Sequence, residues 1–137
     1  MTAETFTGLL QQVLTTAGVT VPVWYGQPRT GAPLPYIVVT ESTASVIKSD
    51  ARGLLVVDET HQFDLWQDTE AEDYRLPDRI TTALLTARRG RVAGTPVHRL
   101  KPVNTGLRVP VDSEAPADEP ALSRHMWTVA VWRRLPA

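Results

Sequence analysis

The sequence predicts an α+β fold, a mixed or antiparallel sheet with two helices packed on one of its faces. Two patterns predict it. Apolar residues recur with helical periodicity near the start of the chain and again in its middle, and β-branched and aromatic runs lie between and after these segments. No internal repeat is visible. The 137 residues therefore fit a single domain, residues 1–137, with elements in the order α-β-β-β-α-β-β.

The first element is an amphipathic helix, predicted over residues 3–17. Thr2 or Thr5 can cap its start, because a side-chain oxygen there accepts a hydrogen bond from an unpaired backbone N–H group. Gly18 is well placed to end it, because glycine readily adopts the left-handed conformation that closes many helices. The apolar face is made of Phe6, Leu9, Leu10, Val13, Leu14 and Ala17.

Three strands are expected after this helix. Residues 21–25 form the first, and Pro22 places it at a sheet edge or a strand start. Residues 36–40 form the second, whose continuous apolar run predicts burial on both faces for part of its length. The third strand region covers residues 55–57 and 60–67, where apolar and polar side chains alternate.

Two connections separate these strands. Residues 26–35 are rich in proline and glycine and predict a turn-rich loop. Residues 42–52 are mostly polar but contain Val46 and Ile47 between two strong strand signals. A long hairpin fits this second segment, as does a loop that becomes ordered only against a partner.

A second helix is expected to start at Asp68–Glu70, where acidic side chains suit the positive end of the helix dipole. Pro77 either kinks this helix or lies in the first turn of its main portion. Gly90 can end it, and the Gly90–Gly94 segment is expected to be a turn. Basic residues that complement the dipole at its far end are Arg88, Arg89 and Arg91.

The last third of the chain predicts two strands and one long connection. Residues 97–101 and 125–133 have strand patterns. Between them, residues 102–121 hold four prolines and the acidic residues Asp112, Glu114, Asp118 and Glu119. This composition predicts a long exposed loop or arm.

Charge and composition exclude several classes of protein. With 14 basic and 15 acidic residues the net charge is −1, which argues against nucleic acid as the main ligand. The absence of cysteine removes disulfide scaffolds, zinc–thiolate sites and thiol nucleophiles. The first residues lack the basic region and apolar run of a signal peptide, and no apolar stretch is long enough to cross a bilayer. We therefore expect a protein that is made and used without export.

One group of ionisable residues could in principle bind a metal or catalyse hydrolysis. His61, Asp64 and Asp68 lie close together in sequence, near other acidic residues. On a strand, however, the two aspartates share one face and the histidine takes the other, so the three do not converge. We expect solvated strand-face and cap residues here. His98 and His125 are scattered in other predicted strands, and no Gly-x-Ser-x-Gly motif supports a hydrolase triad.

Protein interfaces are the better-supported use of the polar faces. Core burial is expected for at least half of the four tryptophans. Trp66 and Trp132 share their surroundings with polar or charged residues, a combination enriched at protein interfaces. The full set of candidate interface residues is Val46, Ile47, Lys48, Arg52, Trp66, Arg88, Arg89, Trp132 and Arg133.

The order of these segments resembles the tail-terminator, or tail-completion, family of long-tailed phages. The resemblance rests on Val23-Trp24-Tyr25-Gly26, on Leu34-Pro35-Tyr36-Ile37-Val38-Val39 after a Pro/Gly loop, and on His61-Gln62-Phe63-Asp64-Leu65-Trp66. The helix ending Ile80-Thr81-Thr82-Ala83-Leu84-Leu85, the N-terminal helix and the closing strand Met126–Trp132 complete it. It covers most of the chain and departs at residues 102–121, which are longer and richer in proline than the family pattern suggests.

The resemblance implies a structural virion protein of the tail and neck, assembled in the host cytoplasm. Such a subunit forms a ring, expected to be a homohexamer, that caps the tail tube and stops its polymerisation. Its implied partners are further copies of itself, the tail tube protein, the head-completion or stopper protein and, as a further candidate, the tape-measure protein. The implied role is not enzymatic and needs no cofactor or metal, and no membrane is involved. DNA only passes through the lumen, so the inner wall should carry acidic or neutral side chains.

Three other readings stay open at this point. Another ring protein of the head–tail junction, such as a head-completion subunit, would show similar features. A small metal-dependent nuclease or hydrolase would use His61, Asp64 and Asp68. A host-encoded α+β adaptor domain would have no tube-binding surface at all.

Overall fold

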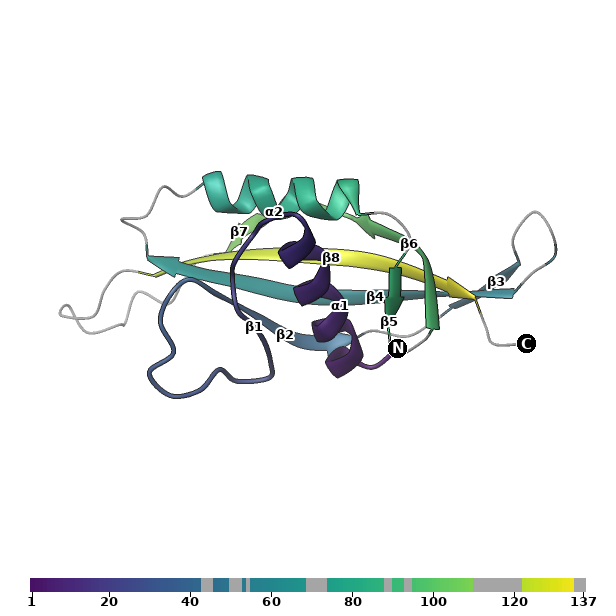
Figure 1. Cartoon of the computed structure of the whole chain (residues 1–137), viewed down its shortest axis with the longest axis horizontal. Helices are drawn as coiled ribbons and strands as arrows, with labels where there is room; N and C mark the ends of the chain where they lie inside the picture. The colour runs from purple at the N-terminus through teal and green to yellow at the C-terminus, as the bar shows by residue number, and fades with distance from the viewer. Residues whose placement is uncertain are drawn as a thin grey trace.

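A computed structural model describes residues 1–42, 46–49, 53, 55–68, 74–87, 90–92, 95–109 and 122–134. It has the predicted α+β architecture, with two helices and a mixed sheet (Figure 1). The predicted order of elements is recovered, with short strands added to it. The helices are α1 (Ala3–Thr16) and α2 (Arg75–Thr86); the strands are β1 (Val23–Tyr25), β2 (Tyr36–Ser42), β3 (Val46–Ser49), β4 (Leu55–Asp68), β5 (Gly90–Val92), β6 (Thr95–Pro102), β7 (Leu107–Val109) and β8 (Leu122–Arg134).

The sheet is built around one long antiparallel pair, β4 and β8, which stay in register from Val56↔Arg134 to Asp68↔Leu122. The main strand order is β1-β2-β4-β8-β6-β5, and only β1 and β2 run parallel. Two short strands lie off this path. β3 pairs with β4 and continues along the same edge as β2, whereas β7 pairs with β8 along the same edge as β6.

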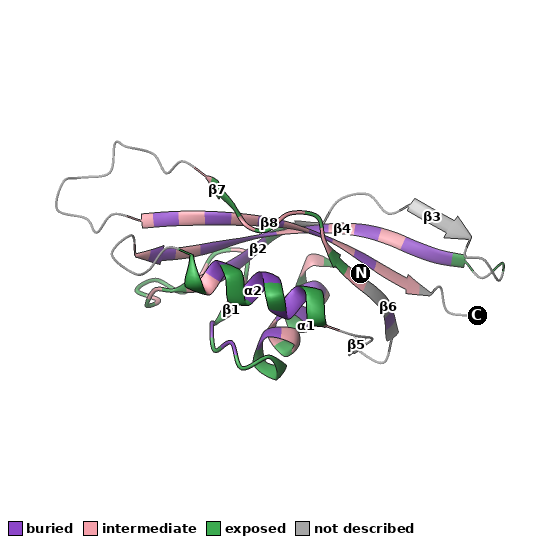
Figure 2. Ribbon diagram, turned by 90° about the horizontal axis from the view of Figure 1, so that it is seen from above, coloured by how far each residue is buried: buried purple, intermediate pink, exposed green. Residues whose placement is uncertain are grey.

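Both helices cover the same face of the sheet, as predicted (Figure 2). From α1, Phe6 stacks on His61 of β4 with ring centroids 4.4 Å apart. From α2, the Thr81 hydroxyl accepts a hydrogen bond from Trp127 Nε1 of β8 at 3.0 Å and donates one to the Thr105 carbonyl. Phe63 lies between these contacts, stacked on Trp127 at 5.1 Å. The core is therefore a single layer between the helices and one sheet face.

The ends of α1 follow the predicted chemistry. The Thr2 hydroxyl oxygen accepts a hydrogen bond from Thr5 N at 3.1 Å and caps the first turn. At the other end Gly18 has φ +77°, its N–H bonds to Thr15 O, and Val19 N bonds to Leu14 O. This pair of bonds is the Schellman closure, which needs a residue that tolerates positive φ.

The predicted limits of the second helix are wrong at both ends. Asp68 is the last residue of β4, and α2 begins only at Arg75. A helix starting at residue 69 would place Pro77 in its interior, where proline lacks an N–H and clashes with the preceding turn. With the observed start, Pro77 lies in the first turn. The helix ends at Thr86, and Gly90, expected to end it and to open a turn, is the first residue of β5.

Two predicted connections contain strands. The hairpin expected over residues 42–52 is present where the chain is described, because β3 pairs with the start of β4. Within the predicted loop 102–121, Pro102 ends β6 and residues 107–109 form β7. Residues 110–121 lie outside the described part of the chain. None of the described helices is long and apolar enough to span a membrane.

Candidate assembly surface

The two faces of the β4–β8 ladder differ sharply in burial. Because side chains alternate along each strand, the odd-numbered residues face the helices and the even-numbered residues face the other way. The helix-covered face is buried at every described position of the two strands from residue 59 to 67 and from 123 to 131. Its members are Glu59, His61, Phe63, Leu65, Gln67, Ser123, His125, Trp127, Val129 and Val131.

Neither α1 nor α2 lies over the opposite face (Figure 2). We call it the open face and define it by the cross-strand partners of β4 and β8 on that side. Most of its side chains are half-buried, while Asp64 is buried. The pairs are Asp58↔Trp132, Thr60↔Ala130, Gln62↔Thr128, Asp64↔Met126 and Trp66↔Arg124.

At one end of the open face an ion pair lies against a tryptophan. Arg124 Nη2 donates to Asp64 Oδ2 at 3.1 Å, and the Arg124 guanidinium lies 5.4 Å from the centre of the Trp66 ring. A guanidinium over an indole face is an attractive cation–π contact. Asp64 is 3% exposed, so its charge is largely withdrawn from water and is compensated by Arg124. The contacts hold the indole of Trp66 in one place on a half-buried surface.

Further along, the open face is less charged. The side-chain amide of Gln62 donates to the sulfur of Met126, which bridges the two long strands. Trp132 lies opposite Asp58 near the other end of the ladder and is half-buried. The face thus offers two tryptophans and a methionine within a polar surround. These residue types are enriched at protein interfaces.

The covered face contains a polar cluster of a different kind, beneath the start of α1. Glu59 is 1% exposed and accepts hydrogen bonds from the Met1 ammonium and from Arg133 Nε, the latter at 2.9 Å. Its second oxygen lies 3.3 Å from His61 Nε2. Burial alone would raise the pKa of the Glu59 carboxyl, but hydrogen bonds from Met1, Arg133 and His61 outweigh it and hold that pKa below its usual range.

His61 in this cluster is a core residue. It is fully buried, and burial lowers the pKa of the imidazole because apolar surroundings disfavour its charged form; Glu59 opposes the effect only in part. The imidazole ring stacks on the ring of Phe6 within the core. This cluster ties the beginning of the chain to β4 and β8.

The expectation that His61, Asp64 and Asp68 are solvated is wrong for two of them. His61 and Asp64 are buried because β4 is an inner strand, covered by α1 on one side and by Arg124 on the other. The predicted divergence is confirmed, since His61 belongs to the covered face and Asp64 to the open face. Within the described part of the chain, no three His, Asp or Glu side chains gather as a metal site would require.

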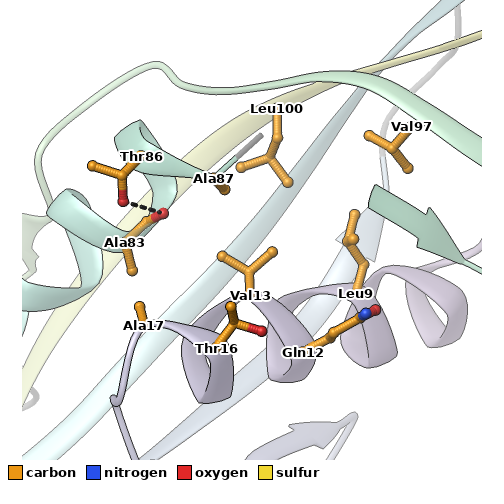
Figure 3. A pocket seen from close by; sticks show the side chains of 10 residues that line it. All are labelled: Leu9, Gln12, Val13, Thr16, Ala17, Ala83, Thr86, Ala87, Val97 and Leu100. Atoms are coloured by element: carbon orange, nitrogen blue, oxygen red, sulfur yellow. Dashed lines mark hydrogen bonds between the residues drawn. The ribbon is translucent and has the colours of Figure 1, made fainter. Parts of the chain in front are cut away.

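Two of the grooves beside the helices bear on the question of an active site. One, of about 460 Å³, runs between α1, α2 and β6 and is largely apolar (Figure 3). The other, also about 460 Å³, lies beside the start of α2 and includes Arg79, whose Nη2 donates to Gly18 O at 2.9 Å. The first groove is lined by Leu9, Gln12, Val13, Thr16, Ala17, Ala83, Thr86, Ala87, Val97 and Leu100. Among the described residues, no ionisable side chain lines the first groove, and the second is lined by one carboxylate, Asp68, with the guanidinium groups of Arg75 and Arg79.

The structure brings some of the candidate interface residues together. Trp66 and Trp132 both lie on the open face, whereas Arg133 points to the covered side and bonds to Glu59. Val46, Ile47 and Lys48 lie in β3, at the end of the sheet near Trp132. Arg52, Arg88 and Arg89 lie outside the described residues.

Neither a protein-family model nor a curated protein matches this chain.

Two features of the surface were missed from sequence. Only Trp127 of the four tryptophans is fully buried; Trp24, Trp66 and Trp132 are half-buried, so the expectation of at least two core tryptophans is wrong. Arg124 and Met126 were not recognised as partners of Asp64. The alternation of side chains along β8 could have placed Arg124 and Met126 on the face opposite Trp127. Their position across from Asp64 depends on the pairing of β4 with β8, which the pattern of one strand does not predict.

Proposed function

We propose that this chain is a ring-forming structural subunit that caps the tail tube of a long-tailed phage, stops its polymerisation and joins the tail to the head-completion proteins. The observation that carries the proposal is the open face: a long, regular sheet surface with two half-buried tryptophans that neither of the described helices covers. A surface of this kind suits contact with another protein.

The sequence segments that resemble the tail-terminator family lend further support, because each falls in a defined element. Val23–Tyr25 is β1, residues 36–39 open β2, residues 61–66 form the middle of β4, and residues 80–85 belong to α2. The resemblance therefore extends over the framework of the fold, from the first helix to the closing strand.

The polar chemistry of the described residues supports a structural role over a hydrolytic one. A hydrolase built on His61, Asp64 and Asp68 would need these groups around one reaction centre. The sheet separates the histidine from the aspartates, and Glu59 and Arg124 already hold His61 and Asp64 in internal pairs. Alanine at His61 and at Asp64 tests that alternative directly, since an enzyme would lose turnover while its assembly stayed intact.

The proposal is tested by mixing the purified protein with tail tubes and viewing them by electron microscopy. We expect density at one tube end only and tubes that no longer elongate when tube protein is added. Density along the tube wall, or none, counts against the proposal. Binding only to head–tail connectors and never to tube ends would favour a head-completion subunit instead.

A matched pair of variants ties this result to the open face. Trp66→Gln removes the half-buried indole beside Arg124, and we expect capping to require at least about tenfold more protein. Leu85→Gln changes a side chain on α2 that is 67% exposed, away from the open face, and should cap as wild type. Equal loss in both variants would remove the open face from the account.

A further inference from the structure

Two short strands at the margins of the sheet have pairing edges that the described chain does not use. β3 pairs with β4, and β7 pairs with β8, but among the described residues neither has a strand on its outer side. An unpaired strand edge presents a row of N–H and C=O groups that can accept another strand. Exposed apolar side chains lie next to both edges: Leu55 at the β3 end, and Val103 and Leu107 at the β7 end.

The two edges differ in a way that suits a head-to-tail contact. β3 lies on the β4 side of the central ladder and β7 on the β8 side, at opposite ends of it (Figure 1). β3 runs antiparallel to β4, β7 runs antiparallel to β8, and β4 runs antiparallel to β8. The directions of β3 and β7 are therefore opposite, so two copies in the same orientation would bring these strands together as an antiparallel pair.

We infer that β3 of one copy pairs with β7 of the next copy, so that the sheet continues from subunit to subunit around an assembly. The inference rests on the proposed ring-forming function and identifies the contact between neighbours. A ring needs two different complementary surfaces on each subunit, and two unlike edges provide them.

The register of the central ladder gives the offset between neighbouring copies. β3 pairs with Leu55–Asp58, whereas β7 lies across β8 from Asp64–Trp66. The centres of these two stretches are about eight to nine residues apart, roughly 28 Å along the strands at about 3.3 Å per residue. Each copy would contribute four strands to the continuous sheet, β3, β4, β8 and β7. The same strand in neighbouring copies is therefore also displaced sideways by roughly 19 Å, at about 4.8 Å per strand.

This staggered step leaves the other strands clear of one another. β2 pairs with β4 only from His61 onward, beyond the stretch used by β3. β6 pairs with β8 between Val129 and Arg133, away from the stretch used by β7. When a neighbouring copy places its β7 beside β3, the contact therefore does not overlap β2 of the first copy. It does not overlap β6 of the neighbouring copy either. Sheet twist would rotate each copy relative to the last, and a closed ring requires such a rotation.

The test uses single cysteines, because the chain has none of its own. Ser49→Cys places a thiol in β3 at a position in register with Leu55, and Arg108→Cys places one in β7 at an exposed position in register with His125. Leu55 and His125 are odd-numbered residues of the ladder, so both positions belong to the same face of the sheet. The two variants, one carrying a size tag, are mixed under assembling conditions and treated with a short bismaleimide. We expect a mixed S49C–R108C dimer at several times the yield of either self-linked dimer. The double variant should give a ladder of products that ends at the size of the ring.

Tyr25→Cys is the matched control, since Tyr25 is 55% exposed in β1, another marginal strand. Mixed with R108C it should give only background linkage. Circular dichroism of each variant confirms that the substitution has left the fold intact, and hydrogen exchange on unmodified protein provides a second readout. Assembly should slow the exchange of amides in β3 and β7 together and leave those of β1 unchanged.

Several outcomes would overturn the inference. They are self-linked S49C dimers in equal yield, assembly without S49C–R108C linkage, and a protein that stays monomeric even with tail tubes present. The strand pairing and the proposed function fail separately. Capped tubes without the cross-link would refute the pairing alone, and efficient cross-linking without tube capping would refute the terminator role alone.

Discussion

The covered and open faces of the β4–β8 ladder are made by the same two strands, yet they carry different chemistry. On the covered face, buried rings stack in pairs: Phe6 on His61, and Phe63 on Trp127. On the open face, Trp66 lies against the guanidinium of Arg124, which is paired with Asp64, and stays half-buried. Under the proposed function, stability depends on the residues of the covered face and assembly on the residues that alternate with them. Substitutions one position apart should therefore have different consequences.

The largest effect is expected in the middle of the covered face. Phe63→Ala removes a fully buried ring that stacks on Trp127, and it should lower the free energy of unfolding by about 3–5 kcal/mol. Urea denaturation followed by tryptophan fluorescence measures it. Tyr25→Ala, at an exposed aromatic side chain, should stay within about 0.5 kcal/mol of wild type. A loss at Phe63 no larger than that at Tyr25 would mean that the covered face is not the core.

Glu59→Gln is the next largest. It leaves the Met1 ammonium and Arg133 without their carboxylate partner, and breaking a buried ion pair in this way should cost about 3 kcal/mol. Chemical denaturation at neutral pH measures the change. Gln is nearly the same size as Glu, so an unchanged stability would show that the charge of Glu59 is unimportant.

Gly106→Ala should be destabilising by about 2 kcal/mol or more. Gly106 has φ +92°, and an added Cβ would lie 2.5 Å from Cζ2 of the buried Trp127 ring. Gly26 has φ +72° but open space around it, so Gly26→Ala should cost only the backbone term of about 1 kcal/mol. Thermal unfolding of the two variants separates crowding from backbone strain, and equal losses would contradict the close approach to Trp127.

Trp66→Ala should change stability little, by about 1 kcal/mol, because the indole is only half-buried. Its effect on tube capping should be much larger, at least about tenfold in the protein concentration needed to cap the tubes. Electron microscopy of tube ends over a concentration series measures the second effect and urea denaturation the first. A variant that caps tubes as wild type would remove Trp66 from the interface.

The smallest effect concerns pH. The pKa of His61 is lowered in the folded protein, so the folded state stays neutral while the unfolded chain takes up a proton below its ordinary value of 6.5. The contribution of the neutral His61 to the free energy of unfolding is therefore fully present above that pH and decreases as the pH falls. The depressed pKa of Glu59 acts in the same direction at lower pH, where its carboxylate is protonated.

His61→Gln should flatten this dependence between about pH 7.5 and 5.5, since glutamine does not titrate. Denaturation midpoints across that range measure the slope. A slope equal to that of wild type would assign the pH dependence to other groups.

Much of the fold could be predicted because its signals are local. The apolar spacing of α1, the Thr2 cap and Gly18 each depend on a few neighbouring residues, and all three are confirmed. The start of α2 was misplaced because the acidic run at residues 68–70 looks like a helix start. What decides the boundary is the pairing of Asp68 with Leu122, a contact between distant segments.

The candidate surface was harder to predict for the same reason. Alternation along β4 correctly placed His61 and Asp64 on opposite faces of the sheet. It could not predict that both side chains are buried, because their burial depends on contacts with α1 and β8. The short strand β7 was missed inside a proline-rich stretch, where three residues between Gly106 and Pro110 give too weak a signal. The composition and burial of the open face therefore depend on contacts between elements, and the pattern of a single strand does not predict those contacts.

Cryo-electron microscopy of capped tube ends tests the account most directly. We predict a closed ring of identical copies at one end of the tube, with the indole of Trp66 buried against another protein chain in every copy. A tube end without a ring, or a ring in which the whole face bearing Trp66 and Trp132 stays in contact with solvent, would contradict it.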